Sequence, residues 1–205
     1  MGFDGDCNLL VAGVGGQGSV LIGNILGEAA ISEGLHVWVG ETFGMSQRGG
    51  SVVSHIRIGR DILSPITPEG EGDVVLGLEP MEALRVAHRY LRMGGKIILN
   101  PRQVLPSDVI SGLSGYPSIE DIFAALDQLA GEVHRVDAAG LAEKSGNTMT
   151  VNTVMLGALA ASRLLPLSLS SVEAAIRQGV PPKTVDVNLK AFSLGVNAVQ
   201  TSQDS

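Results

Sequence analysis

The sequence is poor in cysteine and in positive charge, and each shortage excludes a class of protein. A single cysteine, Cys7, cannot close an intrachain disulfide, and one thiolate cannot hold an iron–sulfur cluster or a structural zinc ion. Lys and Arg number 14 against 21 Asp and Glu, a net charge of −7 without a basic stripe. Nucleic-acid-binding proteins need such a stripe. We therefore expect a chain without a cluster of its own and without a nucleic-acid partner.

Long hydrophobic runs are also missing. Residues 1–6 are acidic and polar, whereas a secretory signal is basic and then apolar. The longest apolar helix candidate, residues 151–165, is interrupted by polar side chains and is shorter than the ~20 residues that span a bilayer. These features predict a cytoplasmic protein that does not enter a membrane, with residues 151–165 forming a core helix.

The hydrophobic fraction is 44% although aromatic residues make up only 3%, so the core must be aliphatic. The 27 glycines indicate many tight turns, and both features are typical of layered α/β proteins. A length of 205 residues suits one domain, which we assign to residues 1–200, followed by a polar tail at 201–205.

Short apolar runs alternate with segments of helical periodicity along the chain. The runs predict strands at residues 8–14, 35–41, 51–58, 73–78, 96–99 and 134–137, of which 51–58 alternates and is expected to be half-buried. The periodic segments predict helices at residues 19–33, 81–93, 118–130, 139–144, 151–164, 170–177 and 185–200. Ser118 with Asp121 and Ser170 with Glu173 form the pattern of capping boxes. Residues 101–117 are expected to leave the core.

This alternation predicts the fold class α/β, with a Rossmann-like open, mostly parallel sheet, helices on both faces and a C-terminal helical layer. Residues 8–41 are expected to form a strand–helix–strand unit whose two strands are parallel.

The strongest local motif follows the first strand. Residues 13–18 match G-x-G-x-x-G, and we take Gly13, Gly15, Gly16, Gln17 and Gly18 as candidate cofactor contacts. Such a turn points backbone N–H groups and a helix N-terminus at a phosphate or carboxylate. Glu41 ends the second strand, where a Rossmann enzyme holds ribose hydroxyls. Alone, the pair favours a dinucleotide site, but glycines also serve a tight turn that binds nothing.

A second motif leaves the second strand at residues 44–50. Arg48 precedes Gly49 and Gly50, and its guanidinium suits an anion or a partner chain. We take Gln47 and Arg48 as candidate catalytic residues and the two glycines as candidate cofactor contacts. The alternative is a surface turn with an exposed arginine.

The other polar residues indicate structural roles. No metal site is expected, because the four histidines show no ligand spacing: His36, His55, His88 and His134. Glu79 and Glu82 are expected to cap a helix. Asn147, Asn152 and Asn188 are expected to bond backbone, and residues 157–161 to pack closely. The sequence contains neither a Ser–His–Asp signature nor a thiamine-diphosphate signature.

Taken together, three motifs resemble the gamma-type domain of 2-oxoacid:ferredoxin oxidoreductases: residues 13–18, 44–57 and 77–85. Further matches resemble the indolepyruvate branch over nearly the whole chain: Asn100-Pro101, Tyr116-Pro117, Val136-Asp137-Ala138, Gly146-Asn147, Asn152, Met155-Leu156-Gly157-Ala158 and Asn188 to Phe192.

The resemblance implies a small subunit of a heteromeric enzyme that converts indolepyruvate and other aryl pyruvates to aryl-acetyl-CoA while reducing ferredoxin. It also implies a large (alpha) subunit that carries thiamine diphosphate, Mg and [4Fe–4S] clusters, with coenzyme A as co-substrate. The glycine loop and residues 47–50 would then face coenzyme A or the partner's active site. Three alternatives stay open: a pyruvate or 2-oxoglutarate gamma subunit, an NAD-dependent dehydrogenase, and a non-catalytic docking module.

Overall fold

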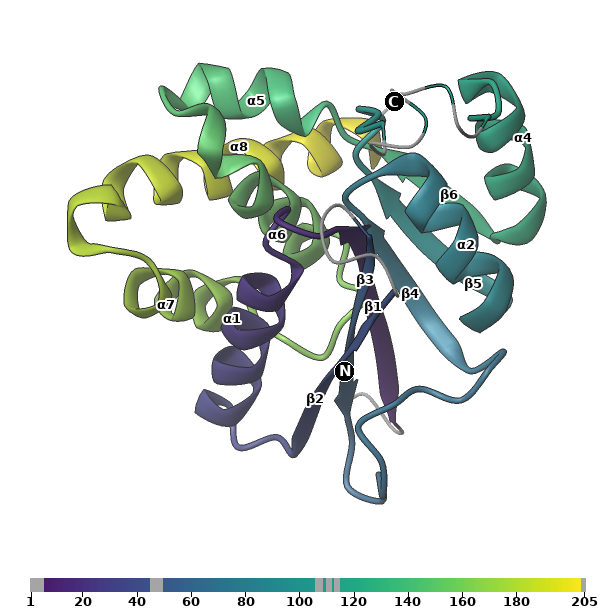
Figure 1. Cartoon of the computed structure of the whole chain (residues 1–205). Coiled ribbons are helices and arrows are strands. Elements are labelled where there is room, and N and C mark those ends of the chain that lie inside the picture. Colours follow the sequence, from purple (N-terminus) through teal and green to yellow (C-terminus); the bar gives the residue numbers. More distant parts are fainter. Residues whose placement is uncertain (1–5, 45–49, 106–108, 110–111, 113–114, 204–205) are drawn as a thin grey trace.

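A computed structural model describes residues 6–44, 50–105, 109, 112 and 115–203, with side chains to residue 200. Its centre is a six-stranded sheet with helices on both faces (Figure 1). The strands are β1 (Cys7–Val14), β2 (Val37–Phe43), β3 (Ser51–Ile58), β4 (Gly72–Gly77), β5 (Leu91–Leu99) and β6 (Glu132–Arg135). The helices are α1 (Ser19–Ser32), α2 (Pro80–Tyr90), α4 (Ile119–Leu129), α5 (Ala138–Ser145), α6 (Val151–Ala161), α7 (Leu169–Gly179) and α8 (Val185–Gln203).

The strand order is β2-β3-β1-β4-β5-β6. Strands β1, β4, β5 and β6 are parallel, whereas β3 is antiparallel to both of its neighbours. The expected open, mostly parallel α/β sheet is therefore confirmed. The expected strand–helix–strand unit needs a correction: β1 and β2 run in the same direction but are not neighbours, because β3 lies between them.

Strand β1 is buried on both faces and divides the core into two layers. Leu9 and Val11 point to the layer under α1, α6, α7 and α8, and Leu10 and Ala12 to the layer under α2 and α4 (Figure 1). A strand with both faces covered needs a continuous apolar run, as in Leu-Leu-Val-Ala.

The C-terminal helical layer is held by a close crossing of α6 and α8. A Cβ atom on Gly157 would lie 2.2 Å from the carbonyl oxygen of Phe192, and one on Gly195 would lie 2.0 Å from that of Val154. Only hydrogen fits at these positions, so the expected close packing is confirmed. Helix α6 is the predicted core helix. In the described part of the chain, we find no helix with the length and apolar character needed to traverse a bilayer.

Strand β3 differs from its prediction, because seven of its eight residues are buried and only Ser51 is intermediate. The polar members of the alternation find partners in the segment that follows β3. Arg57 donates from Nη1 to the carbonyls of Ser64 and Ile66 (2.9 and 3.3 Å), and the N–H of Thr67 donates to Nδ1 of His55 (3.2 Å). Burial and the neighbouring arginines lower the pKa of His55 to about 4. The alternating polar side chains of β3 are therefore covered by the loop that follows the strand, and they do not face water.

Two predicted boundaries were wrong because tertiary contacts override local pattern. The helix predicted at residues 81–93 ends at Tyr90, and Leu91 begins β5 by pairing with Gly72. The second capping box is also wrong: Ser168, not Ser170, accepts from the N–H of Ser171 (3.1 Å). The carboxylate of Glu33, which directly follows α1, holds Ser168 in this position by accepting from its N–H and its hydroxyl.

The remaining elements agree to within a few residues. Ser118 caps α4 as predicted, accepting from the N–H of Asp121 (3.1 Å). The last strand ends at Arg135, two residues early, because Asp137 caps α5. Helix α6 ends at Ala161, and α8 continues to Gln203, into the predicted tail. Part of the predicted excursion at 101–117 lies outside the described residues.

The glycine crossing yields a stability prediction. Gly157→Ala forces α6 and α8 apart, so we expect the free energy of unfolding to fall by about 1–3 kcal/mol. Gly27→Ala in α1 is the matched control, because its Cβ would meet Val39 at an ordinary 3.4 Å, and the gain in helix propensity is up to about 1 kcal/mol. Urea unfolding of both variants checks this. If the two variants had the same free energy of unfolding, the argument that the α6–α8 crossing requires glycine at position 157 would be wrong.

Candidate functional site

The candidate site lies at the carboxyl edge of the sheet, where open α/β folds bind ligands. Three of the parallel strands lead into it: β1 runs into the glycine loop at residues 15–18, β4 into Leu78 and Glu79, and β5 into Asn100. Antiparallel β3 begins at the same edge with Ser51, opposite Val14. The N-termini of α1 and α2 both face this edge (Figure 1).

The glycine loop is a fixed turn. Gly16 and Gly18 have φ angles of +96° and +78°, which favour glycine. The N–H of Gln17 donates to the carbonyl of Val14 (3.0 Å), and the N–H of Gly15 donates to that of Gly50 (2.8 Å). The second bond joins the loop to the end of the second motif, so the structure brings the two predicted motifs together at Gly50.

The side chain of Gln17 turns inward and serves the scaffold. Its Oε1 accepts from the N–H of Val14 (2.7 Å), and its Nε2 donates to the carbonyl of Leu78 (3.4 Å), which links the ends of β1 and β4. Glycine at position 13 leaves room for this amide, because a Cβ there would lie 2.8 Å from Oε1 and displace it. Nδ2 of Asn152 in α6 donates to the carbonyl of Gln17 (2.6 Å), confirming the predicted backbone role of that asparagine.

The outer surface of the loop is open to an anion. Gly15 and Gly16 are exposed, and α1 begins without a side-chain cap and without an acidic residue in its first turn. The first N–H groups of a helix carry partial positive charge that favours phosphate or carboxylate. Of the predicted cofactor contacts, the structure gathers Gly13, Gly15, Gly16, Gln17, Gly18 and Gly50 in this turn and its support.

Glu41 is separated from this turn. It pairs with Ser54 of β3, and β3 lies between β2 and β1. With neighbouring strands ~4.8 Å apart, Glu41 is about 10 Å from the β1 axis across the sheet. A Rossmann enzyme places the corresponding acid on the strand next to β1, so the geometry that motivated a ribose contact is missing here. Gln47, Arg48 and Gly49 lie outside the described residues.

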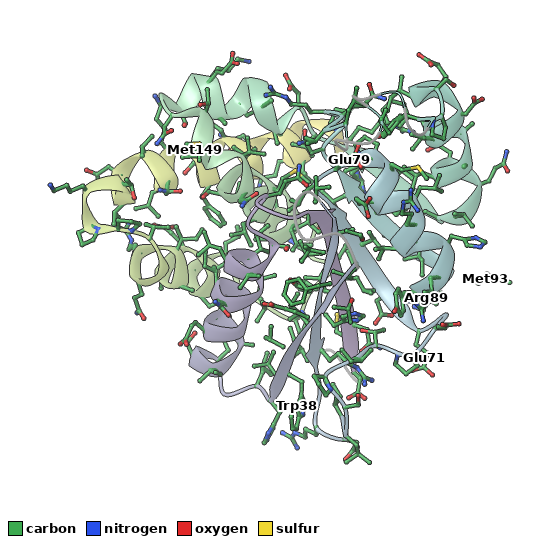
Figure 2. All side chains as sticks on the ribbon, in the orientation of Figure 1. Trp38, Glu71, Glu79, Arg89, Met93 and Met149 are labelled. Atoms are coloured by element: carbon green, nitrogen blue, oxygen red, sulfur yellow. The ribbon has the colours of Figure 1, made fainter. Side chains whose placement is uncertain are left out.

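A buried carboxylate closes the site on the α2 side. Glu79 is only 1% exposed (labelled in Figure 2), and its Oε2 accepts from the N–H of Glu82 (2.9 Å), so the predicted helix cap is confirmed. The hydroxyl of Tyr116 donates to Oε1 of Glu79 at 2.5 Å. Burial and this carboxylate raise the pKa of Tyr116 well above its usual range, so the phenol stays a donor.

Glu82 is the second buried acid, 6% exposed. Burial raises the pKa of Glu82, and the negative charge of Glu79 raises it further. Two contacts oppose this rise. One is a hydrogen bond from Ser51, and the other is the Arg85 guanidinium, whose Nε lies 3.6 Å from Oε1 of Glu82. Within the described residues, Oε2 of Glu82 and Oδ1 of Asn100 have no hydrogen-bond partner. The sequence did not predict that these two oxygen atoms lack hydrogen-bond donors. A polar residue directly after a parallel strand, such as Asn100, is a signal that could have indicated one of them.

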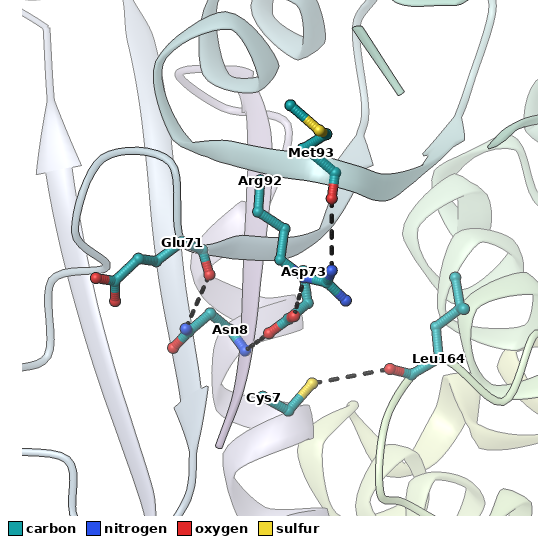
Figure 3. Close-up of polar contacts among 7 residues, drawn as sticks. All are labelled: Cys7, Asn8, Glu71, Asp73, Arg92, Met93 and Leu164. Atoms are coloured by element: carbon teal, nitrogen blue, oxygen red, sulfur yellow. Dashed lines mark hydrogen bonds and ion pairs between the residues drawn. The ribbon is translucent and has the colours of Figure 1, made fainter. Parts of the chain in front are cut away.

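The amino edge of the sheet holds the lone cysteine, and its surroundings do not fit a metal or a cluster (Figure 3). Cys7 is buried, its Sγ lies 3.8 Å from the carbonyl of Leu164, and burial raises the pKa of the thiol to about 12. Beside it Asp73 accepts from the N–H of Asn8 (2.8 Å) and from Nε of Arg92 (2.6 Å). Among the described residues no group of three potential ligands gathers around a metal position.

Comparison with known proteins places this architecture. The family model of pyruvate ferredoxin/flavodoxin oxidoreductase matches residues 8–198. The chain belongs to this family. It is 46% identical over 194 residues to the indolepyruvate oxidoreductase subunit IorB of Pyrococcus horikoshii, covering 94% of this chain and 96% of the relative. It is 31% identical to the 2-oxoglutarate synthase subunit KorC of Methanothermobacter thermautotrophicus, covering 90% of each chain.

The fold has the same relatives. The gamma subunit of a keto/oxoacid ferredoxin oxidoreductase from Geobacter sulfurreducens superposes with a TM-score of 0.70 at 25% identity, covering 95% of this chain and 99% of that one. The predicted resemblance to the gamma-type domain and to its indolepyruvate branch is therefore confirmed, and the chain is an oxidoreductase subunit by family.

Glu82 yields a pH prediction. Because its pKa is raised above the ordinary 4.5, the stability that its protonated form contributes is present below that value and is lost as pH rises through the folded-state pKa. We expect Glu82→Gln to gain stability relative to the wild type as pH rises from about 4 to 7. Thermal unfolding across this range measures the difference. Glu71→Gln, on an exposed loop, is the control, and a parallel pH profile for both variants would contradict the burial argument.

Proposed function

We propose that the chain is the small subunit of a heteromeric, thiamine-diphosphate-dependent 2-oxoacid:ferredoxin oxidoreductase. Its substrates are indolepyruvate and other aryl pyruvates, which it converts with coenzyme A to aryl-acetyl-CoA and CO2 while the electrons pass to ferredoxin. The observation that carries this proposal is the 46% identity, over nearly the full length of both chains, to an indolepyruvate oxidoreductase subunit.

The single cysteine of this chain indicates which subunit holds the iron–sulfur clusters. Its one thiol is buried, with a raised pKa, and iron–sulfur clusters need several accessible thiolates. The [4Fe–4S] clusters therefore belong to another subunit, and we place them with thiamine diphosphate and Mg in the large subunit, as the family resemblance implies. This chain contributes a rigid sheet edge, and it does not act alone.

We place coenzyme A, or the coenzyme A-facing surface of the large subunit, against the glycine loop and the second motif. The support is the exposed Gly15 and Gly16, the uncapped N-terminus of α1, and the bond that joins Gly15 to Gly50. A phosphate suits such amides, and Arg48 is the guanidinium nearest in sequence to this junction. Gln47 remains a candidate contact of the same surface, whereas Glu41 lies on β2, with β3 between it and the glycine turn.

Assembly tests the function directly. The tagged chain, purified without oxygen from its own host, is expected to bring a larger subunit, iron and thiamine diphosphate with it. The complex should reduce ferredoxin faster with indolepyruvate than with pyruvate or 2-oxoglutarate. A preference for either of the last two would move the chain to the corresponding gamma subunits, and an iron-free chain that purifies alone would overturn the proposal.

Arg48 tests the placement of coenzyme A. Loss of one charge-assisted hydrogen bond removes about 1.5–3 kcal/mol, so Arg48→Ala in the assembled enzyme should raise the KM for coenzyme A at least about tenfold. Arg60→Ala is the matched control, since Arg60 follows the end of β3 at the opposite edge of the sheet and is exposed. Unchanged coenzyme A dependence and unchanged subunit association in Arg48→Ala would refute the placement.

A further inference from the structure

Strand β2 ends the sheet, and in the described residues its outer edge has no strand beside it. The register of β2 with β3 shows which backbone N–H and C=O groups of β2 form no hydrogen bond with β3. The carbonyl of His36 accepts from Gly59, and the N–H of Gly44 donates to Ser51, so the even-numbered residues bond β3. Bonding alternates along an antiparallel ladder. The odd-numbered residues therefore point their N–H and C=O groups outward: Val37, Val39, Glu41 and Phe43.

Apolar side chains flank this outer row. Trp38 is 46% exposed and Phe43 is 67% exposed, and Figure 2 shows Trp38 at the lower end of the sheet. Helix α1 adds exposed Val20 and Ile31, which share a helical stripe with Gly27, whose position contacts Val39. We call Val20, Ile31 and residues 37–43 the β2 edge surface.

The edge has few of the devices that keep edge strands apart in water, and Glu41 is the only charged residue of β2. Strand β2 contains no Lys and no Pro, and its pairing with β3 runs from Val37 to Phe43 without a bulge. Natural proteins use such charges, prolines and bulges to block further pairing. A regular edge that keeps its donors and acceptors free, with apolar flanks, is suited to receive another strand.

We propose that the β2 edge surface pairs with the same surface of a second copy of this chain. The two β2 strands run antiparallel about a two-fold axis at Gly40, and one sheet continues through both chains. This contact between copies is independent of the proposed function. It places Glu41 within the contact between the two copies.

The sequence of β2 is self-complementary about Gly40. Every outward N–H meets an outward C=O of the second copy, because residues 37 to 43 are centred on that glycine. Trp38 faces Thr42 of the second copy, an aromatic and β-branched pair that is favourable across strands. Glu41 faces Val39 of the second copy, so like charges are not directly opposite. Gly40 faces Gly40, where no side chain keeps the backbones apart. An unrelated chain would match this arrangement of side chains only by chance. In a two-fold contact, the same strand supplies both sides of the pairing.

The mass of the full chain in solution tests the contact. Sedimentation or light scattering should give twice the mass of one chain, falling to one chain on dilution. Val39→Pro removes one outward N–H that β3 does not use, and it should weaken self-association at least tenfold. Val39→Ala keeps that N–H while losing the side chain, and it should remain dimeric.

A second pair of variants keeps the test decisive if Val39→Pro misfolds. Phe43→Lys places a charge on the exposed edge and should give a monomer. Met93→Lys makes the same kind of change at an exposed apolar residue of β5 (Figure 2), and it should not change the mass. Hydrogen exchange adds a readout by residue: the amides of Val37, Val39, Glu41 and Phe43 should exchange faster on dilution, whereas those of Trp38, Gly40 and Thr42 stay protected.

Three results would overturn the proposal. The chain could have the mass of one copy at every concentration with fast-exchanging outward amides. It could be dimeric and remain so in both Val39→Pro and Phe43→Lys. It could be monomeric alone and protect the outward amides only with the large subunit, in which case that subunit covers the edge.

Discussion

The amide side chain of Gln17 holds the carboxyl edge of the sheet together. Its oxygen accepts from β1 at Val14, and its nitrogen donates to the carbonyl of Leu78 after β4. Leu78 in turn accepts from Nδ2 of Asn100 at the end of β5 (3.3 Å). One half-buried glutamine therefore connects three parallel strands. Gly13 leaves room for this arrangement, since a Cβ there would lie only 2.8 Å from the Gln17 oxygen.

Local chemistry in the sequence predicted the glycine turn, α1 and the cap of α2, because those features depend on residues close in the chain. The position of β3 between β1 and β2 was not predictable from periodicity, which identifies a strand but not its neighbours. The same limit applies to the burial of β3. Arg57 and His55 alternate as solvent-facing residues would, yet the carbonyls and N–H groups of residues 64–67 cover them. The cap at Ser168 depends on Glu33, 135 residues earlier in the chain.

The candidate site could be predicted only in part from the sequence, for a related reason. The glycine motif indicated an anion at a helix N-terminus, and the turn has the open amides that this requires. Its partner acid at Glu41 was inferred from the strand order of dinucleotide-binding folds, and that order does not hold here. Glu79 and Tyr116 meet across 37 residues, so their contact is a property of the fold. Family resemblance supplied the role of the chain, which composition and spacing left open.

The bond from Asn152 to the carbonyl of Gln17 has a consequence for biosynthesis. It joins residues 135 positions apart, and α6 is itself held by its crossing with α8. Contacts so distant in sequence form late, because the loop between them must close first. The glycine turn therefore reaches its final geometry only after α6 has packed against it. A chain folded only as far as β6 would present an incomplete carboxyl edge to a partner.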